Sequence, residues 1–440
     1  MKLASSLGVF TIFLFLCYCI FFLFVPADAV EADRGIGLAA SHIVIDPNNP
    51  KTIYVSSTFY GVYKSIDGGI TWQLKNKGVG APDFYALAIH PKNPRILFVG
   101  AAGGGIYKSE DGGEIWADAN NGLTDTSVYD IVFDPEDPAV MYALTLREVF
   151  RSTDTGRHWK PVFNDDRWIL DPNYHRRLFI ITGKKTIFLV GTIKRGYRRA
   201  ENENRWMPLV GGLEGVRVTT FAYHPVTKAV YAGAVFADGL YKSLDDGLTW
   251  TLIGGGLSGV WVNRIVTDPI HPQVIYLATR NKGMLKSEDG GASWKEINNG
   301  IPQTEIEIKA LAADPKNPQV LYLGTYNSGI YASTDGGDHW VHRDVPTYPT
   351  WSELNASLVR KIQAKGQVPL PPSVFFKCQQ CHAWTDPILN GPLKQTFWRT
   401  FPSHRDWKET IARMKVPAQL TPAEEAEILK YLNTYYGPEG

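Results

Sequence analysis

The sequence predicts a multi-domain protein, with an all-β domain of seven repeated units followed by a small all-α domain. Two observations carry this prediction. An eight-residue pattern recurs along residues 36–345 at a nearly constant period, and the hydrophobic pattern becomes helical after residue 373. The chain has 440 residues, of which 44% are apolar and 20% are charged, which is enough for two ordinary hydrophobic cores.

Residues 1–29 have the pattern of an export signal. Lys2 precedes an apolar run over residues 8–25, and the small-residue stretch 26–29 has the form of a cleavage site. The run is also long enough to span a bilayer, so an uncleaved anchor in the inner membrane stays open as an alternative. Both alternatives predict an exported, most simply periplasmic, protein. Without this segment only two of the four cysteines remain, Cys378 and Cys381.

Charge excludes some classes of partner. The formal net charge is +1, so the chain as a whole attracts neither nucleic acid nor anionic lipid. We therefore expect no nucleic-acid partner, and a membrane contact only if the N-terminal segment stays uncleaved.

Residues 30–345 form the repeat domain. Six copies of the pattern Ser-x-Asp-x-Gly-x-x-Trp begin at Ser65, Ser109, Ser152, Ser243, Ser287 and Ser333. The gap between the third and fourth of these copies is about twice the usual period. In its middle Arg199, Glu201, Glu203 and Trp206 stand at the same spacing, which we interpret as a seventh, eroded copy. The period suits four short strands per unit.

Each unit is expected to contain the same elements in the same order. In the second unit these are strands near residues 87–89, 96–100 and 105–108, then the Ser/Asp pattern and a short strand after its Trp. Asp-Pro pairs begin the first turn in four units, at Asp46, Asp134, Asp268 and Asp314. His90 and His224 occupy the same position in two others and are expected to be turn residues.

These motifs resemble those of the Asp-box (BNR) β-propellers, over nearly all of residues 36–345. The resemblance implies an all-β seven-bladed propeller, in which Ser and Asp bind turn amides and Trp packs between neighbouring blades. It implies little about function, because such propellers serve unrelated functions.

In such a propeller, the starts of the innermost strands and the loops between second and third strands share one face. On that face we predict a candidate site of polar residues: His42, Tyr60, Asp130, Arg264, Arg280 and Lys309. A solvated rim is the alternative interpretation. A basic stretch in the fourth unit has two interpretations too, a docking patch for an acidic partner or a solvated edge.

After residue 345 the composition changes. Residues 346–372 are rich in proline and are expected to be a linker. Residues 373–440 are expected to form a small all-α domain. Thr421, Pro422 and Glu424 have the form of a capping box at the start of its last helix, which we expect to end at Gly437.

The all-α domain contains the pentapeptide Cys378-Gln379-Gln380-Cys381-His382. A CxxCH sequence is the attachment signature of c-type haem, because two thiols can add to the two vinyl groups while the imidazole reaches the iron. The alternatives are a chance CxxC beside a histidine, or half of a zinc site. Tetrahedral zinc needs further ligands, and no cysteine follows.

The order of CxxCH, a methionine-containing segment and a final helix resembles class I cytochrome c. The resemblance implies one covalent haem c, His382 as the proximal ligand and Met414 as the distal ligand. His404 is the alternative distal ligand, and Met414 as a core side chain also stays open. The connection from His382 to Met414 is shorter than is usual in that family.

The sequence therefore predicts an exported monohaem c-type cytochrome that transfers electrons, with the propeller as a docking or assembly platform. Its redox partner protein is undefined, and no catalytic residue can be chosen. Two alternatives remain: a periplasmic oxidoreductase whose propeller face binds a substrate or second cofactor, and a BNR-type binding or scaffold protein.

Overall fold

Seven four-stranded antiparallel sheets make up the described part of the computed structural model of the chain. It describes residues 39–345 except 58–60, 80–83, 164–176, 183–184, 193–194, 204, 236–238 and 327–328. The expected linker, the CxxCH pentapeptide, Met414, His404 and residues 1–29 lie outside the described residues, as does Tyr60. None of the described residues forms a helix that is long and apolar enough to cross a bilayer.

Each sheet is a blade of four consecutive strands. The first three blades contain β1 (Ala40–Ile45), β2 (Ile53–Ser57), β3 (Gly61–Ser65) and β4 (Gln73–Leu74); β5 (Phe84–Ile89), β6 (Leu97–Ala101), β7 (Gly105–Ser109) and β8 (Ala117–Asp118); and β9 (Val128–Phe133), β10 (Met141–Thr145), β11 (Val149–Ser152) and β12 (Lys160–Pro161).

The fourth and fifth blades follow the same order. They contain β13 (Arg177–Ile181), β14 (Ile187–Gly191), β15 (Gly196–Ala200) and β16 (Met207–Pro208); and β17 (Arg217–Tyr223), β18 (Val230–Val235), β19 (Leu240–Ser243) and β20 (Thr251–Leu252).

The sixth and seventh blades complete the set. They contain β21 (Val262–Thr267), β22 (Ile275–Thr279), β23 (Met284–Ser287) and β24 (Lys295–Glu296); and β25 (Ile308–Ala313), β26 (Leu321–Thr325), β27 (Ile330–Ser333) and β28 (Val341–Arg343). One short 3₁₀ turn, η2 (Gln303–Glu305), precedes the seventh blade.

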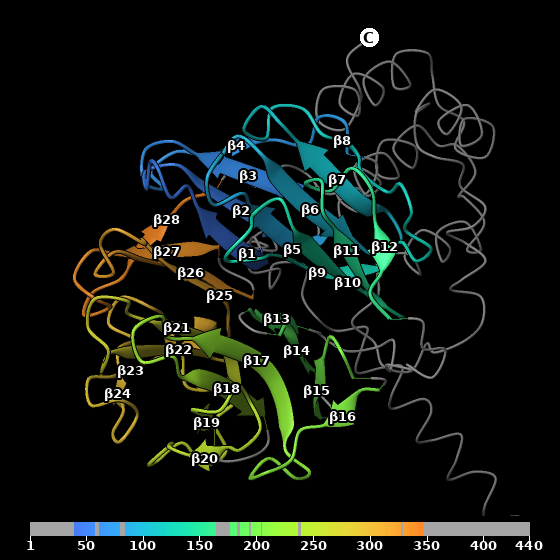
Figure 1. Ribbon diagram of the computed structural model, residues 1–440. Coiled ribbons are helices and arrows are strands. Elements are labelled where there is room, and N and C mark those ends of the chain that lie inside the picture. The colour runs from blue at the N-terminus through green and yellow to red at the C-terminus, as the bar shows by residue number, and fades with distance from the viewer. Residues whose placement is uncertain are drawn as a thin grey trace, which may run out of the picture. The chain divides into compact units, whose positions relative to one another are not determined.

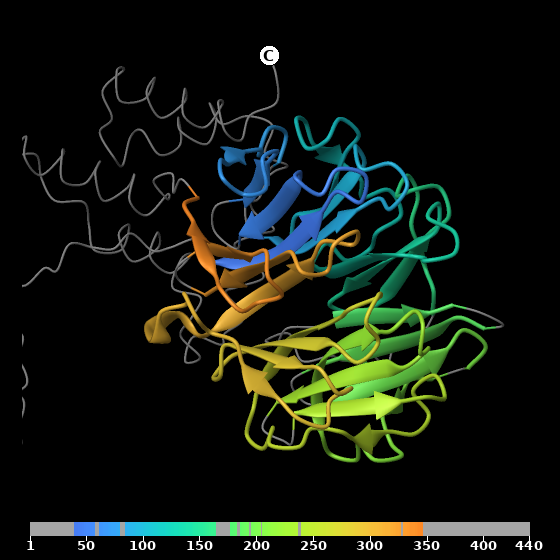
Figure 2. The same cartoon turned by 90° about the vertical axis from the view of Figure 1, so that its left-hand side faces the viewer.

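The blades close into a ring. The first strands of successive blades pack side by side from β1 to β25, and β25 packs against β1. The first blade, blue, lies beside the last, orange, in both views (Figures 1 and 2). Each sheet is built from its own repeat alone, so no strand is exchanged at the closure. The expectation of an all-β seven-bladed propeller is confirmed.

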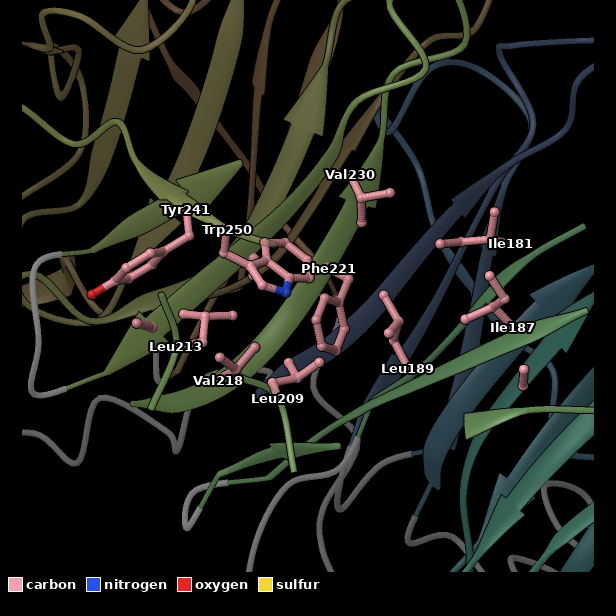
Figure 3. Close-up of a cluster of buried hydrophobic side chains, with 13 residues drawn as sticks. Ile181, Ile187, Leu189, Leu209, Leu213, Val218, Phe221, Val230, Tyr241 and Trp250 are labelled. Carbon is pink, nitrogen blue, oxygen red and sulfur yellow. The ribbon is translucent and has the colours of Figure 1, made fainter. Parts of the chain in front are cut away.

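The core is divided among the seven interfaces between blades. Seven clusters of buried apolar side chains each join two neighbouring blades, and the cluster of the first and seventh blades resembles the others in kind. Figure 3 shows the cluster between the fourth and fifth blades, where Leu189, Phe221 and Trp250 lie together. Each second strand is almost wholly buried because both faces of its sheet are covered by neighbouring blades.

The Ser/Asp loops connect the third and fourth strands of six blades and share one hydrogen-bond pattern. In the first, Ser65 Oγ donates to Asp67 Oδ1 at 2.8 Å and accepts from the amide of Gly69 at 2.8 Å. Asp67 also accepts the amides of Ile70 and Thr71. These bonds and the Thr71 hydroxyl lower the pKa of Asp67 to about 2. The loops are therefore structural.

The Trp of the loop joins neighbouring blades, as expected. Trp116 Nε1 donates to the carbonyl of Lys75 at 2.9 Å, and its backbone amide donates to Lys77. Both acceptors belong to the segment that leaves the first blade. Trp159 and Trp340 repeat this arrangement.

The interpretation of the fourth blade was wrong by one residue. Strand pairing places Ala200 opposite Ile187, where the other blades have the loop serine opposite the first residue of the second strand. The loop to Trp206 is one residue shorter than elsewhere, so the match of Arg199 was accidental. The carboxylate of Glu203 binds the Ala200 amide at 2.8 Å, while the guanidinium of Arg199 lies over the Phe163 ring.

Candidate functional site

The propeller has two distinct faces. The turns between first and second strands bind the Ser/Asp loops, as when the Gly112 amide donates to Arg95, and together they form the turn face. The loops between second and third strands bind the segments that enter the innermost strands, as when the Arg280 amide donates to Trp261. We call this second side the entry face. The expected division of the loops between two faces is confirmed.

A β-bulge shapes the innermost strand of every blade except the fourth. The bulged residues are Ser41, Tyr85, Tyr129, Thr219, Asn263 and Lys309. In three blades the bulged side chain donates to the backbone of the next blade. Ser41 Oγ donates to Phe84 O at 3.3 Å, Thr219 Oγ1 to Val262 O at 2.9 Å, and Asn263 Nδ2 to Ile308 O at 2.8 Å.

These bonds fix the position of each blade along the propeller axis relative to the next blade. Each acceptor is the carbonyl of the residue just before the next blade's bulge. Residues that follow a bulge therefore lie at one level of the ring, and His42, Asp130 and Arg264 all have this position. Sequence alone gave no signal for the bulges, since their side chains differ from blade to blade.

The first group of candidate residues, here the axis group, consists of His42, Asp130, Arg177 and Arg264. Arg177 Nη1 lies 3.7 Å from Asp130 Oδ1 and also contacts Nε2 of His42. Arg264 donates to Asn263 O at 2.7 Å and to Ser41 O at 3.3 Å. The ring thus brings together three of the predicted residues, and adds Arg177, which the sequence showed only as part of a basic stretch.

Asp130 is buried and well bonded. It accepts the amides of Ile131 at 3.0 Å and Leu178 at 2.9 Å. Burial raises its pKa above the ordinary value of an aspartate, while Arg177 and the two amides oppose that rise. Burial also lowers the pKa of Arg177, against the attraction of Asp130.

The second group, here the entry-face group, lies between the sixth and seventh blades. Glu307 Oε1 is 3.5 Å from Arg280 Nε and 3.6 Å from Lys309 Nζ. Arg280 stacks 4.8 Å from the centre of the Trp261 ring, and Lys309 lies 4.2 Å from that of Tyr326. One carboxylate thus joins two cation–π pairs. The predicted residues Arg280 and Lys309 belong here, whereas no sequence pattern indicated Trp261 or Glu307.

The pKa of the Lys309 ammonium group is shifted by its surroundings. Burial lowers its pKa, Glu307 opposes that effect, and Arg280 adds to it. The backbone of Glu307 is held as well, because Tyr326 donates its amide to the carbonyl of Glu307 at 3.0 Å. The group is therefore a rigid surface that combines aromatic rings with fixed charges.

Metal binding in the propeller has no support among the described residues, where no three His, Cys, Asp or Glu side chains could hold an ion together. The histidines have structural partners. Nδ1 of His90 accepts the amides of Lys92 and Asn93, and His224 accepts those of Val226 and Thr227. Both are turn residues, as the sequence predicted.

Comparisons with known proteins agree with the fold. A family model described as Sortilin-Vps10 (Sortilin, neurotensin receptor 3) matches residues 238–351, which is less than half of the chain. No curated protein matches the chain.

Among solved structures, the GH74 xyloglucanase from Xanthomonas campestris is similar at 19% identity, with a TM-score of 0.56 and coverage of 71% of this chain and 55% of the hydrolase. GH74 from Niastella koreensis is similar at 16% identity, with a TM-score of 0.54 and coverage of 70% and 54%. The chain thus spans about half the length of these two hydrolases.

A third similar structure, "YCF48 bound to D1 peptide", has 12% identity, a TM-score of 0.52 and coverage of 67% of this chain and 93% of YCF48. At such identities the likeness concerns the fold alone. Together with the seven sheets and their closure, it identifies the chain as a seven-bladed β-propeller protein.

Proposed function

We propose that this protein is an exported monohaem c-type cytochrome that transfers electrons and uses its propeller as a docking or assembly platform. The observation that carries the proposal is the pentapeptide Cys378-Gln379-Gln380-Cys381-His382. Two thiols and one imidazole at this spacing are the donor set that covalent haem attachment needs. No other cysteine follows residue 29, so none competes with these two thiols for a disulfide in the exported chain.

Each residue has a distinct role in this proposal. Cys378 and Cys381 would hold the porphyrin through thioether bonds, and His382 would be the proximal ligand of the iron. Met414 would be the distal ligand, with His404 as the alternative. The haem supplies reversible one-electron chemistry, and a Met ligand would set a higher potential than a second His.

The propeller would supply a rigid surface for a partner. Its blades are joined by hydrogen bonds at the bulges, and backbone hydrogen bonds hold the entry-face group. Little conformational entropy would therefore be lost when a partner binds. The six Ser/Asp loops support placing the chain among the Asp-box propellers. YCF48, whose fold is similar, has been solved with a peptide bound, which supports a docking role for this propeller.

The test is expression in a host that attaches c-type haem during export. We expect a band that stains for haem after denaturation, and a c-type reduced-minus-oxidised spectrum from the same sample. Cys378→Ala with Cys381→Ala should abolish the stain, whereas the exposed propeller variant Arg95→Gln should retain it. A full-length, exported protein without covalent haem would overturn the proposal and favour a BNR-type scaffold.

The distal ligand needs its own pair of variants. If Met414 binds the iron, the oxidised protein should show a weak band at ~700 nm that Met414→Ala removes and His404→Ala leaves unchanged. A covalent-haem protein that lacks this band, and whose oxidised spectrum is changed by His404→Ala but not by Met414→Ala, would assign His404 instead.

A second candidate function is an oxidoreductase whose propeller binds a substrate or second cofactor and passes electrons to the haem. The entry-face group favours it, since Trp261, Tyr326 and the charges of Arg280, Glu307 and Lys309 combine apolar and polar contacts as ligand sites do. Reduction of the haem by a substrate, lost in Arg280→Gln but kept in Arg95→Gln, would support this candidate over the carrier.

A further inference from the structure

The innermost strands carry an excess of positive charge. Their charged residues are the cations Arg177, Arg217, Arg264 and Lys309 and the single carboxylate Asp130. The net charge of the whole chain is only +1. Two of these cations, Arg177 and Arg264, belong to the axis group, which contains one carboxylate, Asp130.

Three blades present small side chains at the level of the axis group. The residue after the bulge is Ala86, Thr220 or Ala310 in three of the six bulged blades, while His42, Asp130 and Arg264 occupy the same position in the other three. Long side chains at this level can therefore extend past their own blade.

Two arginines extend past their own blades and contact the first blade. Arg264 reaches from the sixth blade to the carbonyl of Ser41, and Arg177 reaches from the fourth blade to the ring of His42. Ser41 and His42 are consecutive residues of β1, so the two guanidinium groups approach one short segment from different sides of the ring.

The two arginines differ in how their charge is balanced. Arg177 is paired with the carboxylate of Asp130. Within the described part of the chain, Arg264 has two carbonyl acceptors and no carboxylate partner. It is also only partly buried. A partly buried guanidinium without a counter-ion favours an anion beside it.

We propose that the axis of the propeller binds a small oxyanion, of the carboxylate or phosphate class, between Arg264 and the pair of Arg177 with His42. The planar fork of a guanidinium matches two oxygens on one carbon or phosphorus atom. Asp130 holds Arg177 in place through their ion pair. The site does not depend on the haem.

The test uses the full-length exported protein and calorimetric titration with inorganic phosphate and with acetate, in sodium chloride of equal ionic strength. We expect saturable binding of at least one of them, together with a rise in Tm that saturates at the same concentration. Preference for phosphate or for acetate then identifies the source of the oxyanion. The absence of saturable binding for both would overturn the proposal.

Variants localise the effect. Arg264→Gln should weaken binding by at least about tenfold, because a charged hydrogen-bond donor is lost. Arg95→Gln removes an exposed arginine on the turn face and should leave binding unchanged. Should Arg264→Gln fail to fold, Arg264→Lys keeps the charge and should still bind more weakly. Equal binding by the wild type and the folded Arg264 variant would place the anion elsewhere and refute the assignment.

Discussion

At the scale of single residues, the first turns of six blades show that the turn needs a hydrogen-bond acceptor and not a negative charge. Asp46 accepts the amides of Asn48 and Asn49 through one carboxylate oxygen, at 2.7 and 3.1 Å. His90 does the same through Nδ1, at 3.1 and 3.0 Å. An imidazole accepts at Nδ1 only when that nitrogen carries no proton. The histidine turns are therefore equivalent to the aspartate turns only while the ring is neutral.

This difference predicts an acid sensitivity that can be removed. Burial lowers the pKa of His90, so the folded state prefers the neutral ring, and the stability it contributes is lost as pH falls below the ordinary histidine pKa. His90→Asp restores the acceptor found in other blades. Between pH 7 and pH 5 we expect urea unfolding to show a smaller loss of stability for His90→Asp than for the wild type.

The two proteins are compared by the slope of their unfolding free energy against pH. Absolute stabilities are not compared, because the variant also loses the contact of the His90 ring with Phe133 and starts from a different stability. Identical slopes for the two proteins would show that His90 does not titrate with folding in this range.

At the scale of elements, glycines set how closely the connecting segments approach the next blade. Gly122 follows β8 with a φ of +89°, and a Cβ there would lie 2.1 Å from the carbonyl oxygen of Trp159. The amide of Trp159 binds the carbonyl of Asn121, just before this glycine. Gly78, Gly212 and Gly300 meet the loop tryptophan of the next blade in the same way. The close approach thus requires both a left-handed backbone and the absence of a side chain.

These two requirements can be separated. Gly103 also has a positive φ, +80°, but a Cβ there would meet nothing within 4 Å. We expect Gly103→Ala to cost about 1 kcal/mol of unfolding free energy, from backbone strain alone. Gly122→Ala should cost about 3 kcal/mol or more, because a backbone carbonyl cannot move aside. Chemical denaturation of both variants measures the difference, and similar costs would contradict the steric argument.

Elements also show where sequence reasoning succeeded. The Ser/Asp loops and Asp-Pro turns were predicted because their function needs particular side chains at fixed spacing. The bulges were not, because their geometry is set by strand pairing and tolerates residues as different as Ser41, Tyr85 and Lys309. The fourth blade was misaligned for the related reason that a loop shortened by one residue keeps its strands but shifts its sequence pattern.

At the scale of the whole molecule, the closing interface is built like the others. Tyr322 Oη donates to Gly68 O of the first blade at 3.4 Å, and Tyr54 Oη donates to Gly112 O of the second blade at 3.0 Å. Both tyrosines are buried, and both lie in clusters that span two blades. No chain segment connects the seventh blade directly to the first, so side-chain packing must hold this interface.

We therefore expect Tyr322→Ala and Tyr54→Ala to destabilise the protein by similar amounts, about 3–5 kcal/mol each. Thermal and urea unfolding of the two variants give the comparison. A cost for Tyr322→Ala of less than half that for Tyr54→Ala would mean that the ring closes more loosely than its other interfaces.

The sequence predicted the number of blades and the two faces of the ring, because both follow from the repeat. It predicted the candidate site only in part. His42, Asp130 and Arg264 were among the predicted candidates and lie at one level of the ring. Arg177 joins them from a blade without a recognisable motif, and Glu307 joins Arg280 to Lys309 through packing between blades. Such contacts between distant segments depend on how the blades are aligned, which no local pattern specifies.

Since every sheet is encoded by one uninterrupted repeat, a single duplicated or deleted segment of the gene would add or remove a complete blade without cutting any strand from its partners. Among its described residues the fourth blade has four strands without the serine loop or the bulge, and its two neighbours still supply its packing. A change confined to one repeat therefore leaves the strand pairing of the other six sheets intact.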